Sequence, residues 1–221
     1  MSLKLFRSTE FLSSFFSPEQ QRAALHPAWP VVLASLWIAS AGNLALWREL
    51  MNLPELARAR GLWLGAGLAL MVAAATCALL SLLAWRRTLK PAIAVLLFAS
   101  ALGSHAMLSH GLVIDAALMA KLLQSGSWQA RDLLDWRLFV TLLVLALLPS
   151  IWLGQLPLRR LGPARQLQAN ATVFIASCAV LVLASVFFYQ DFSALAGSHP
   201  QLAQHINPFN SLHALAALVL K

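Results

Sequence analysis

Five runs of apolar residues, each about long enough to cross a membrane as a helix, constrain this chain more than any other feature. They cover residues 29–46, 62–83, 91–108, 138–156 and 171–188. A helix rises 1.5 Å per residue, so about 20 residues cross a hydrocarbon core of about 30 Å. The chain is 60% hydrophobic and 11% charged, whereas soluble domains carry about 25% charged residues. The sequence therefore predicts an all-α integral membrane protein with five transmembrane helices.

The charged residues between these runs predict which side each connection faces. Residues 1–28, the link after the second run and the link after the fourth hold nine basic and two acidic residues, and the rest of the chain holds seven and six. Short cytoplasmic loops carry an excess of Lys and Arg. The N-terminal arm, residues 1–28, is therefore expected in the cytoplasm. Five crossings then place residues 111–135 and the tail, residues 189–221, together on the opposite side.

The basic residues also bear on the class of partner. The net charge is +8, which by itself would suit a nucleic acid. The Lys and Arg residues stand in short groups between apolar runs, however, and not along one polar face. Membrane topology accounts for this pattern, and we expect no nucleic-acid partner.

Residues 111–135 are the longest polar-containing segment between two apolar runs, and they predict short amphipathic helices at the membrane surface. Asp115 stands where an N-cap side chain is wanted, and Gly126 stands where a left-handed residue ends a helix. Apolar residues lie between them at helical spacing: Leu118, Met119, Leu122 and Leu123. A capped helix of this kind is a suitable place to meet a lipid.

The chain offers few groups for catalysis. His105 and His110 stand five residues apart, a poor match to the four-residue spacing of a helical metal pair, and no carboxylate lies between them. Cys77 and Cys178 lie inside apolar runs without metal or redox spacing. We therefore assign no catalytic residue and no metal ligand.

Three features bear on contacts between the predicted helices. Asn43, in the first run, could bond another helix or a lipid headgroup, and helix packing is the simpler interpretation. Gly61 and Gly65, with Gly67, make a small-residue pattern that allows close packing within the chain or, alternatively, between two copies. Pro149 predicts a kink in the fourth helix.

Several separated motifs resemble one family. GNLALWREL in the first run, LLAWRRTLKP after the second, GLVID and ARDLL in residues 111–135, and INPFN in the tail are similar to the N-terminal membrane domain of bacterial lipid A phosphoethanolamine transferases. The resemblance covers roughly residues 30–221. It implies five transmembrane helices followed by a large periplasmic domain of alkaline-phosphatase-like fold. That domain carries a threonine nucleophile and zinc, and moves phosphoethanolamine from phosphatidylethanolamine to lipid A.

The resemblance also implies how the chain is divided. Residues 1–28 are the cytoplasmic arm, residues 29–188 the five-helix domain in the bacterial inner membrane, and residues 189–221 a periplasmic tail leading to a catalytic domain. No nucleophile motif or zinc-ligand cluster of that second domain occurs before Lys221. We therefore expect zinc only in the absent domain and no cofactor here. The chain is either a fragment or a stand-alone relative.

The same resemblance points to a lipid-binding site in residues 111–135. After the VID motif the family shows Asn, Thr and Glu at four-residue intervals, which are implicated in headgroup binding. The matching residues here are Lys121, Ser125 and Gln129. Ser keeps a hydroxyl, Gln loses the charge, and Lys adds a cation that can pair with a lipid phosphate. The alternative is that these side chains are the water-facing side of an interfacial helix.

We expect a membrane-anchoring domain of a phosphoethanolamine transferase that presents phospholipid, phosphatidylethanolamine among them, and is not catalytic by itself. Its partners would be membrane phospholipids and either a periplasmic catalytic domain or a full-length transferase. The alternative is a stand-alone interaction or regulatory protein that pairs with a full-length transferase or another membrane protein. A small transporter fits less well, because transporters usually have paired halves and five unrepeated spans offer none.

Overall fold

The computed structural model of the chain describes residues 24–53, 59–85, 87–111, 135–159, 161–198 and 206–210. These ranges are almost entirely helical, and their single β-type pairing is a parallel bridge between Leu25 and Leu158. The elements are α2 (Ala28–Ser40), η1 (Ala41–Asn43), α3 (Leu44–Asn52), α4 (Ala59–Leu82), α5 (Leu89–His110), α8 (Trp136–Leu142), the π-helical η3 (Leu143–Leu147), α9 (Leu148–Gln155), α10 (Pro163–Phe187) and α11 (Tyr189–Ser198).

Five helices of the described residues are long and apolar enough to cross a membrane. They run over Ala28–Asn52, Gly61–Leu82, Leu89–Ser109, Trp136–Gln155 and Pro163–Phe187. The predicted fold class, an all-α protein with five transmembrane helices, is confirmed. The predicted runs fall on these five helices, although their ends differ by up to eight residues.

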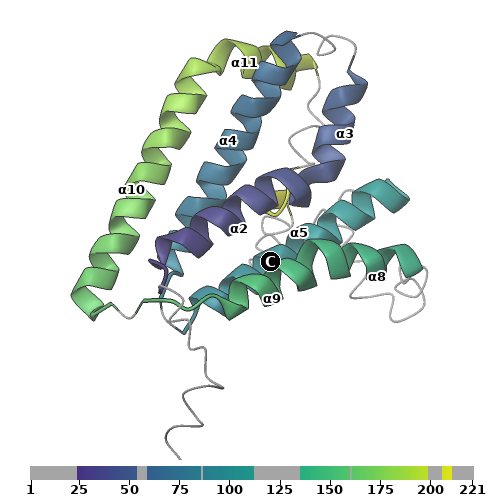
Figure 1. Cartoon of the computed structure of the whole chain (residues 1–221). Helices are drawn as coiled ribbons and strands as arrows, with labels where there is room; N and C mark the ends of the chain where they lie inside the picture. Colours follow the sequence, from purple (N-terminus) through teal and green to yellow (C-terminus); the bar gives the residue numbers. More distant parts are fainter. Residues whose placement is uncertain are drawn as a thin grey trace, which may run out of the picture.

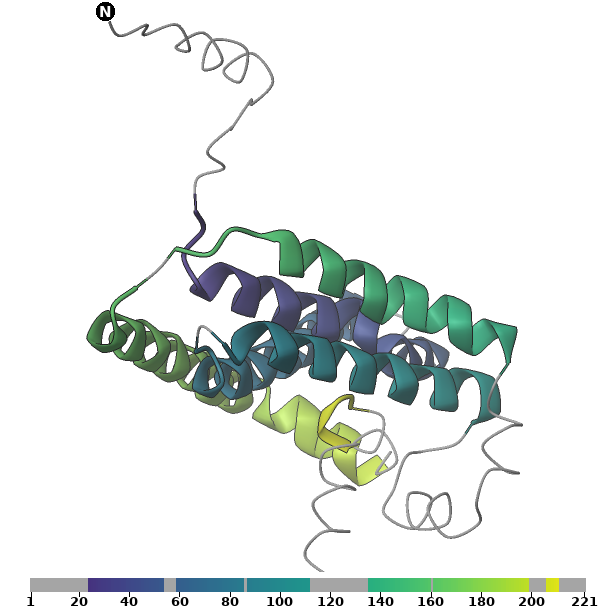
Figure 2. The ribbon, with the colours of Figure 1, turned by 90° about the horizontal axis from the view of Figure 1, so that it is seen from below.

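The helices form two groups that meet at one end (Figure 1). Helix α4 packs against α10 and α2, while α5 packs against α8, η3 and α9. Figure 2 shows α5 and the α8–α9 helix side by side from below. We call the end where the groups meet the basic end (residues 24–27, 83–90 and 156–165). The opposite end, where the groups diverge, is the tail end (residues 48–53, 61–63, 109–111, 135–137 and 187–198).

The core lies where α2, α4, α5 and the α8–α9 helix meet, and it includes Ile38, Leu80, Leu97 and Ala146. Helix α10 contributes little to it, because only 11% of its apolar window is buried within the chain. Its outward residues are large and apolar, among them Ile175, Val182, Leu183 and Val186. Such a face suits lipid as its solvent, as expected of a multi-pass membrane protein.

Helix α10 begins at Pro163, eight residues before the predicted start of the fifth run. Proline suits the first turn of a helix because that turn has no partner for its N–H groups. Gln166 and Asn170 follow, and both donate their side-chain amides to the carbonyl of Ala84, at 2.8 and 3.0 Å. Hydropathy placed these residues in a connection, but they are buried helix residues whose polar groups are satisfied by the end of α4.

The predicted kink in the fourth helix corresponds to a change of helix type at Pro149. The π-helical η3 immediately precedes α9, and Pro149 stands in the first turn of α9. Proline has no N–H, so the carbonyl of Leu145, four residues earlier, lacks its α-helical donor. The indole Nε1 of Trp37 donates to this carbonyl at 3.1 Å and so joins α2 to the fourth helix.

The residues after α10 form a further helix, α11, in a stretch predicted only as a tail. Phe188 separates the two helices with a backbone conformation outside the helical region. Its ring lies so close to Gly67 that a Cβ there would stand 2.6 Å from Phe188 Cε2. Gly67 is therefore used for packing within the chain, the simpler of the two interpretations of the small-residue pattern. The rest of the tail, residues 211–221, lies outside the described residues.

Candidate functional site

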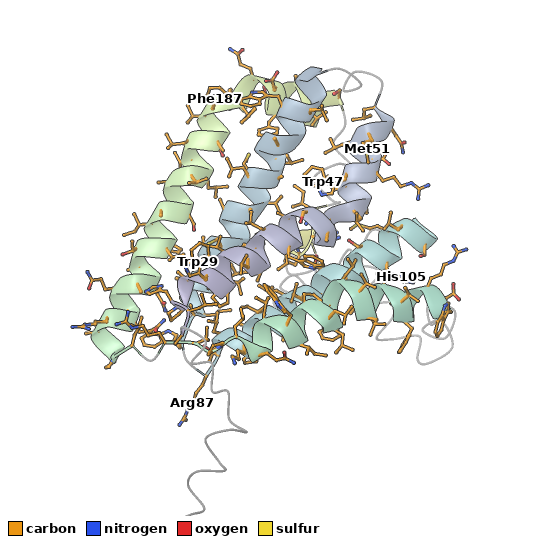
Figure 3. The ribbon with its side chains drawn as sticks, in the orientation of Figure 1. Trp29, Trp47, Met51, Arg87, His105 and Phe187 are labelled. Carbon is orange, nitrogen blue, oxygen red and sulfur yellow. The ribbon has the colours of Figure 1, made fainter. Side chains whose placement is uncertain are left out.

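The first transmembrane helix changes its winding near its middle, where η1 separates α2 from α3. The backbone of Ser40 departs from helical values, with φ −91° and ψ −80°. In lipid a carbonyl without a donor is costly. Here side chains act as the donors. Asn43 Nδ2 donates to Ile38 O at 2.8 Å, and Trp47 Nε1 donates to Ala39 O at 3.1 Å and to Ser40 O at 2.9 Å. Figure 3 shows Trp47 beside this change in winding.

Helix α5 closes the other side of η1. The hydroxyls of Ser100 (2.9 Å) and Ser104 both donate to the carbonyl of Gly42. Gly42 is required for this approach, because a Cβ there would lie 2.3 Å from Ser100 Oγ. Gly42, Ser100 and Ser104 are all buried, so the first and third transmembrane helices are joined by hydrogen bonds shielded from solvent.

The tail contacts the first transmembrane helix at η1, through Asn207. Asn43 and Asn207 form a reciprocal pair: Asn207 N donates to Asn43 Oδ1, and Asn43 Nδ2 donates to Asn207 O, both at 2.8 Å. Both residues are fully buried. The amide of Asn207 donates further to Met107 Sδ at 3.6 Å. A residue 164 positions later in the chain is thus bonded to the first transmembrane helix.

Gly103 completes the contact from α5. A Cβ at this position would stand 2.3 Å from Asn207 Oδ1, so any side chain would displace the tail. We call Gly42, Asn43, Ser100, Gly103, Ser104 and Asn207 the tail-docking cluster. It contains amides, hydroxyls and carbonyls without a charged group, and this chemistry suits holding a segment in place rather than transferring a proton or a phosphoryl group.

His105 lies next to this cluster on α5 and is buried, and Figure 3 shows it on the tail-end half of the helix. Ser109 Oγ lies 3.4 Å from its Nδ1. Among the described residues no three of His, Cys, Asp and Glu come together as metal ligands. The side chain of His110, the other member of the pair considered from the sequence, lies outside the described residues.

The predicted lipid-binding residues Lys121, Ser125 and Gln129 lie within residues 112–134, outside the described residues. The structure does describe the two ends of that segment. Gly111 ends α5 with a left-handed backbone, φ +60°, and its N–H bonds Met107 O at 3.2 Å. Asp135 precedes α8. The segment therefore leaves and rejoins the bundle at the tail end, and Asn207 is held between the helices in the half of the bundle nearer that end.

The pairing of Asn43 with Asn207 was missed by the sequence reasoning. Asn207 is joined to Pro208 by a cis peptide bond. The signal available was a lone amide, Asn43, in an apolar run, because a buried amide needs partners. Such a signal does not say which distant residue supplies them.

Comparison with known proteins gives a consistent result. The family model EptA_B_N, described as phosphoethanolamine transferase EptA/EptB, matches residues 72–221. Phosphatidylethanolamine transferase Mcr-2 of Escherichia coli is 22% identical over 197 residues, which are 89% of this chain and 36% of that protein. Phosphoethanolamine transferase EptA of Salmonella typhimurium is 24% identical over 191 residues, covering 85% of this chain and 34% of that protein.

The fold has a solved counterpart in the lipooligosaccharide phosphoethanolamine transferase A (EptA) of Neisseria meningitidis. The TM-score is 0.77 at 15% identity, over 88% of this chain and 36% of that one. The chain thus spans about a third of the length of these relatives. Because the family model matches well over half of its residues, the chain belongs to the phosphoethanolamine transferase EptA/EptB family, as a membrane domain of that family.

Proposed function

We propose that this chain anchors a phosphoethanolamine transferase in the bacterial inner membrane and presents phospholipid to the transfer chemistry. The tail end would face the periplasm and the basic end the cytoplasm. The relatives named as phosphatidylethanolamine transferases suggest phosphatidylethanolamine as the donor lipid. The chain alone would transfer nothing, since the part of the relatives that it does not match makes up about two thirds of their length.

The observation that carries the anchoring role is the reciprocal pair between Asn43 and Asn207. Each of its two hydrogen bonds is 2.8 Å long and buried. Interhelical hydrogen bonds within membranes are worth about 0.6 kcal/mol on average. Two such bonds, with the close fit against Gly103, hold the backbone of the tail at one register. Any domain that follows the tail would be positioned relative to the membrane by this contact.

A second fixed point lies at the start of the tail. The ring of Phe188 packs over Gly67 and lies 6.0 Å from the ring of Trp63, both on α4. It also lies 5.6 Å from the ring of Phe192 on α11. The tail is therefore held against the bundle at Phe188 and at Asn207, which favours a defined platform over a loose linker.

The described charges support the proposed orientation. Four described basic residues and no acidic one lie at the basic end, namely Arg87, Lys90, Arg159 and Arg165. The described residues of the tail end are mixed, with the basic Arg48 and Arg137 beside the acidic Glu49, Asp135 and Asp191. An excess of Lys and Arg in short loops is typical of the cytoplasmic side.

The anchoring role is tested by exchanging membrane parts. This chain replaces the aligned stretch of Mcr-2, and phosphoethanolamine on lipid A is measured by mass spectrometry. We expect transfer by the exchanged protein, none by this chain alone even with added zinc, and at least a several-fold loss in the exchanged protein with Asn43→Ala. Ser40→Ala, which removes an exposed hydroxyl bonded only within its own helix, serves as the control. An exchanged protein that reaches the membrane at normal levels without transfer would contradict the proposal.

Lipid presentation is tested at Lys121. Replacing its cation by a carboxylate, Lys121→Glu, should weaken phosphatidylethanolamine binding to the purified chain, as measured by native mass spectrometry. Arg137→Glu makes the same change of charge at an exposed position at the start of α8. An unchanged lipid profile in Lys121→Glu would favour the alternative in which these side chains only face water.

A further inference from the structure

The basic end holds a cavity that the anchoring role does not use. Its volume is about 630 Å³, and it lies between the end of α4, the start of α5 and the connection from α9 to α10. Its lining includes Trp85, Lys90, Gln155 and Arg159. The strand-like stretch Pro157–Arg159 in this lining is held by the backbone of Leu25, with Leu25 N–Pro157 O and Arg159 N–Leu25 O both at 2.9 Å.

Two cations, Lys90 and Arg159, line this cavity. Lys90 and Arg159 are both exposed, and the described residues provide neither with a carboxylate. Residues 84–91 and 155–166, which form most of the lining, contain no Asp or Glu at all. The ammonium of Lys90 donates to Gly154 O, which orients the side chain and leaves two of its three N–H groups unused. The cavity therefore offers donors and positive charge to an anion.

The rest of the lining suits the anion of a lipid better than a soluble anion. Trp85 is 43% exposed at the mouth, and indoles favour the depth of the headgroups. Leu156, Leu161 and Pro163 add apolar walls. The lipid-facing side of α10 begins directly beside the cavity. A ligand with a phosphate and an adjoining apolar part would satisfy both kinds of lining.

We propose that this cavity binds the phosphate headgroup of an anionic phospholipid from the leaflet at the basic end. Basic pockets between transmembrane helices are a known way to hold such headgroups. The site lies at the opposite end of the bundle from the tail-docking cluster. The proposed headgroup site is therefore independent of lipid presentation at residues 111–135, and each of the two proposals can be tested without the other.

The test uses the purified full chain in detergent, titrated with phosphatidylglycerol or with zwitterionic phosphatidylcholine and followed by native mass spectrometry. Each Lys or Arg near a phospholipid headgroup contributes about a five-fold preference for anionic lipid. Lys90→Gln with Arg159→Gln should therefore reduce phosphatidylglycerol binding on the order of 25-fold and leave phosphatidylcholine unchanged.

Arg87→Gln is the matched control, because Arg87 is exposed at the same end but does not line the cavity. Figure 3 shows Arg87 projecting away from the helices. We expect its effect to be less than about two-fold, since one exposed charge outside the pocket contributes little when screened by salt. If its loss per charge equals that of the double variant, binding follows general surface charge and the proposal is wrong.

A second variant keeps both cations and fills the cavity. Gln155 lines it and is exposed, so Gln155→Trp adds volume without removing charge. Loss of phosphatidylglycerol binding in Gln155→Trp, with the unfolding temperature unchanged, supports the cavity as the site, and retained binding overturns it. Inorganic phosphate at millimolar concentration should fail to displace the lipid. Displacement would assign the cavity to a soluble phosphate instead.

Discussion

At Gly103 the absence of a side chain lets the tail lie against α5. The space that a Cβ would need is occupied by the side chain of Asn207, whose backbone is already fixed by its two bonds to Asn43. Gly154 on α9 provides a contrast, because no atom lies within 4 Å of the corresponding Cβ position. The two glycines look alike in the sequence and differ only in what the fold brings to them.

The first prediction concerns this pair of glycines. Gly103→Ala should lower the free energy of unfolding by about 1–3 kcal/mol, the range for inserting a methyl group into a packed site. It should also make Phe209→Cys more reactive toward a maleimide, because the tail is displaced. Gly154→Ala should be neutral or stabilising by up to about 1 kcal/mol, since alanine favours a helix. Thermal unfolding in detergent measures the stabilities, and equal stability of the two variants would contradict the docking of the tail.

At the scale of elements, two transmembrane helices change their winding and are joined across those changes by tryptophan. In the first, Trp47 donates to the carbonyls beside η1. In the fourth, Trp37 donates to the carbonyl of Leu145, which lacks its α-helical donor because of Pro149. Hydrocarbon offers no substitute donor, so an irregular helix inside a membrane persists where the protein itself supplies one.

The second prediction tests this link by a double-mutant cycle. Trp37→Phe should lower the free energy of unfolding by about 0.6–1.7 kcal/mol, the range of interhelical hydrogen bonds in membranes, beyond any loss from packing. Pro149→Ala restores a backbone N–H that can serve Leu145 O. In that background the cost of Trp37→Phe should therefore be smaller. Thermal unfolding of the four proteins gives the coupling energy, and an additive cycle would show that Trp37 and Pro149 act independently.

At the scale of the whole molecule, the two ends have different chemistry. The basic end combines four described cations, no described acidic residue and the cavity, whereas the tail end has acidic and basic residues together with α11 and both ends of residues 111–135. The positive-inside rule would orient the protein with its basic end in the cytoplasm. It would thereby place the tail and the predicted lipid-contacting segment on the same side of the membrane.

The third prediction tests the orientation by cysteine labelling. Cys77 and Cys178 are first replaced by alanine, and then Arg87→Cys and Gln190→Cys are made separately, both at exposed positions. A membrane-impermeant maleimide should label residue 190 in spheroplasts and residue 87 only after lysis. The reverse pattern would place the tail end in the cytoplasm and would refute the proposed topology.

Much of the architecture follows from the sequence because a bilayer imposes simple requirements on length, apolarity and loop charge. These requirements predicted five spans, and the fold class is confirmed. The prediction was wrong at the start of α10, where Gln166 and Asn170 were assigned to a connection because they are polar. In the structure both side chains are buried and donate to the carbonyl of Ala84, just after α4. The same requirements also gave no sign of α11, whose residues are too polar to stand out as a span.

The order of apolar and charged residues is enough to predict which segments enter the membrane, and the sequence motifs point to the family to which the chain belongs. The sequence also singles out Asn43, Gly67 and Pro149 as residues that are unusual within apolar helices. Their partners are seen in the fold alone: Asn207 pairs with Asn43, Phe188 packs against Gly67, and Trp37 donates to the Leu145 carbonyl that lacks its helical donor because of Pro149. The physical cause is that span formation depends on local apolarity, whereas the partner of a buried polar group is set by contacts between residues far apart in the chain.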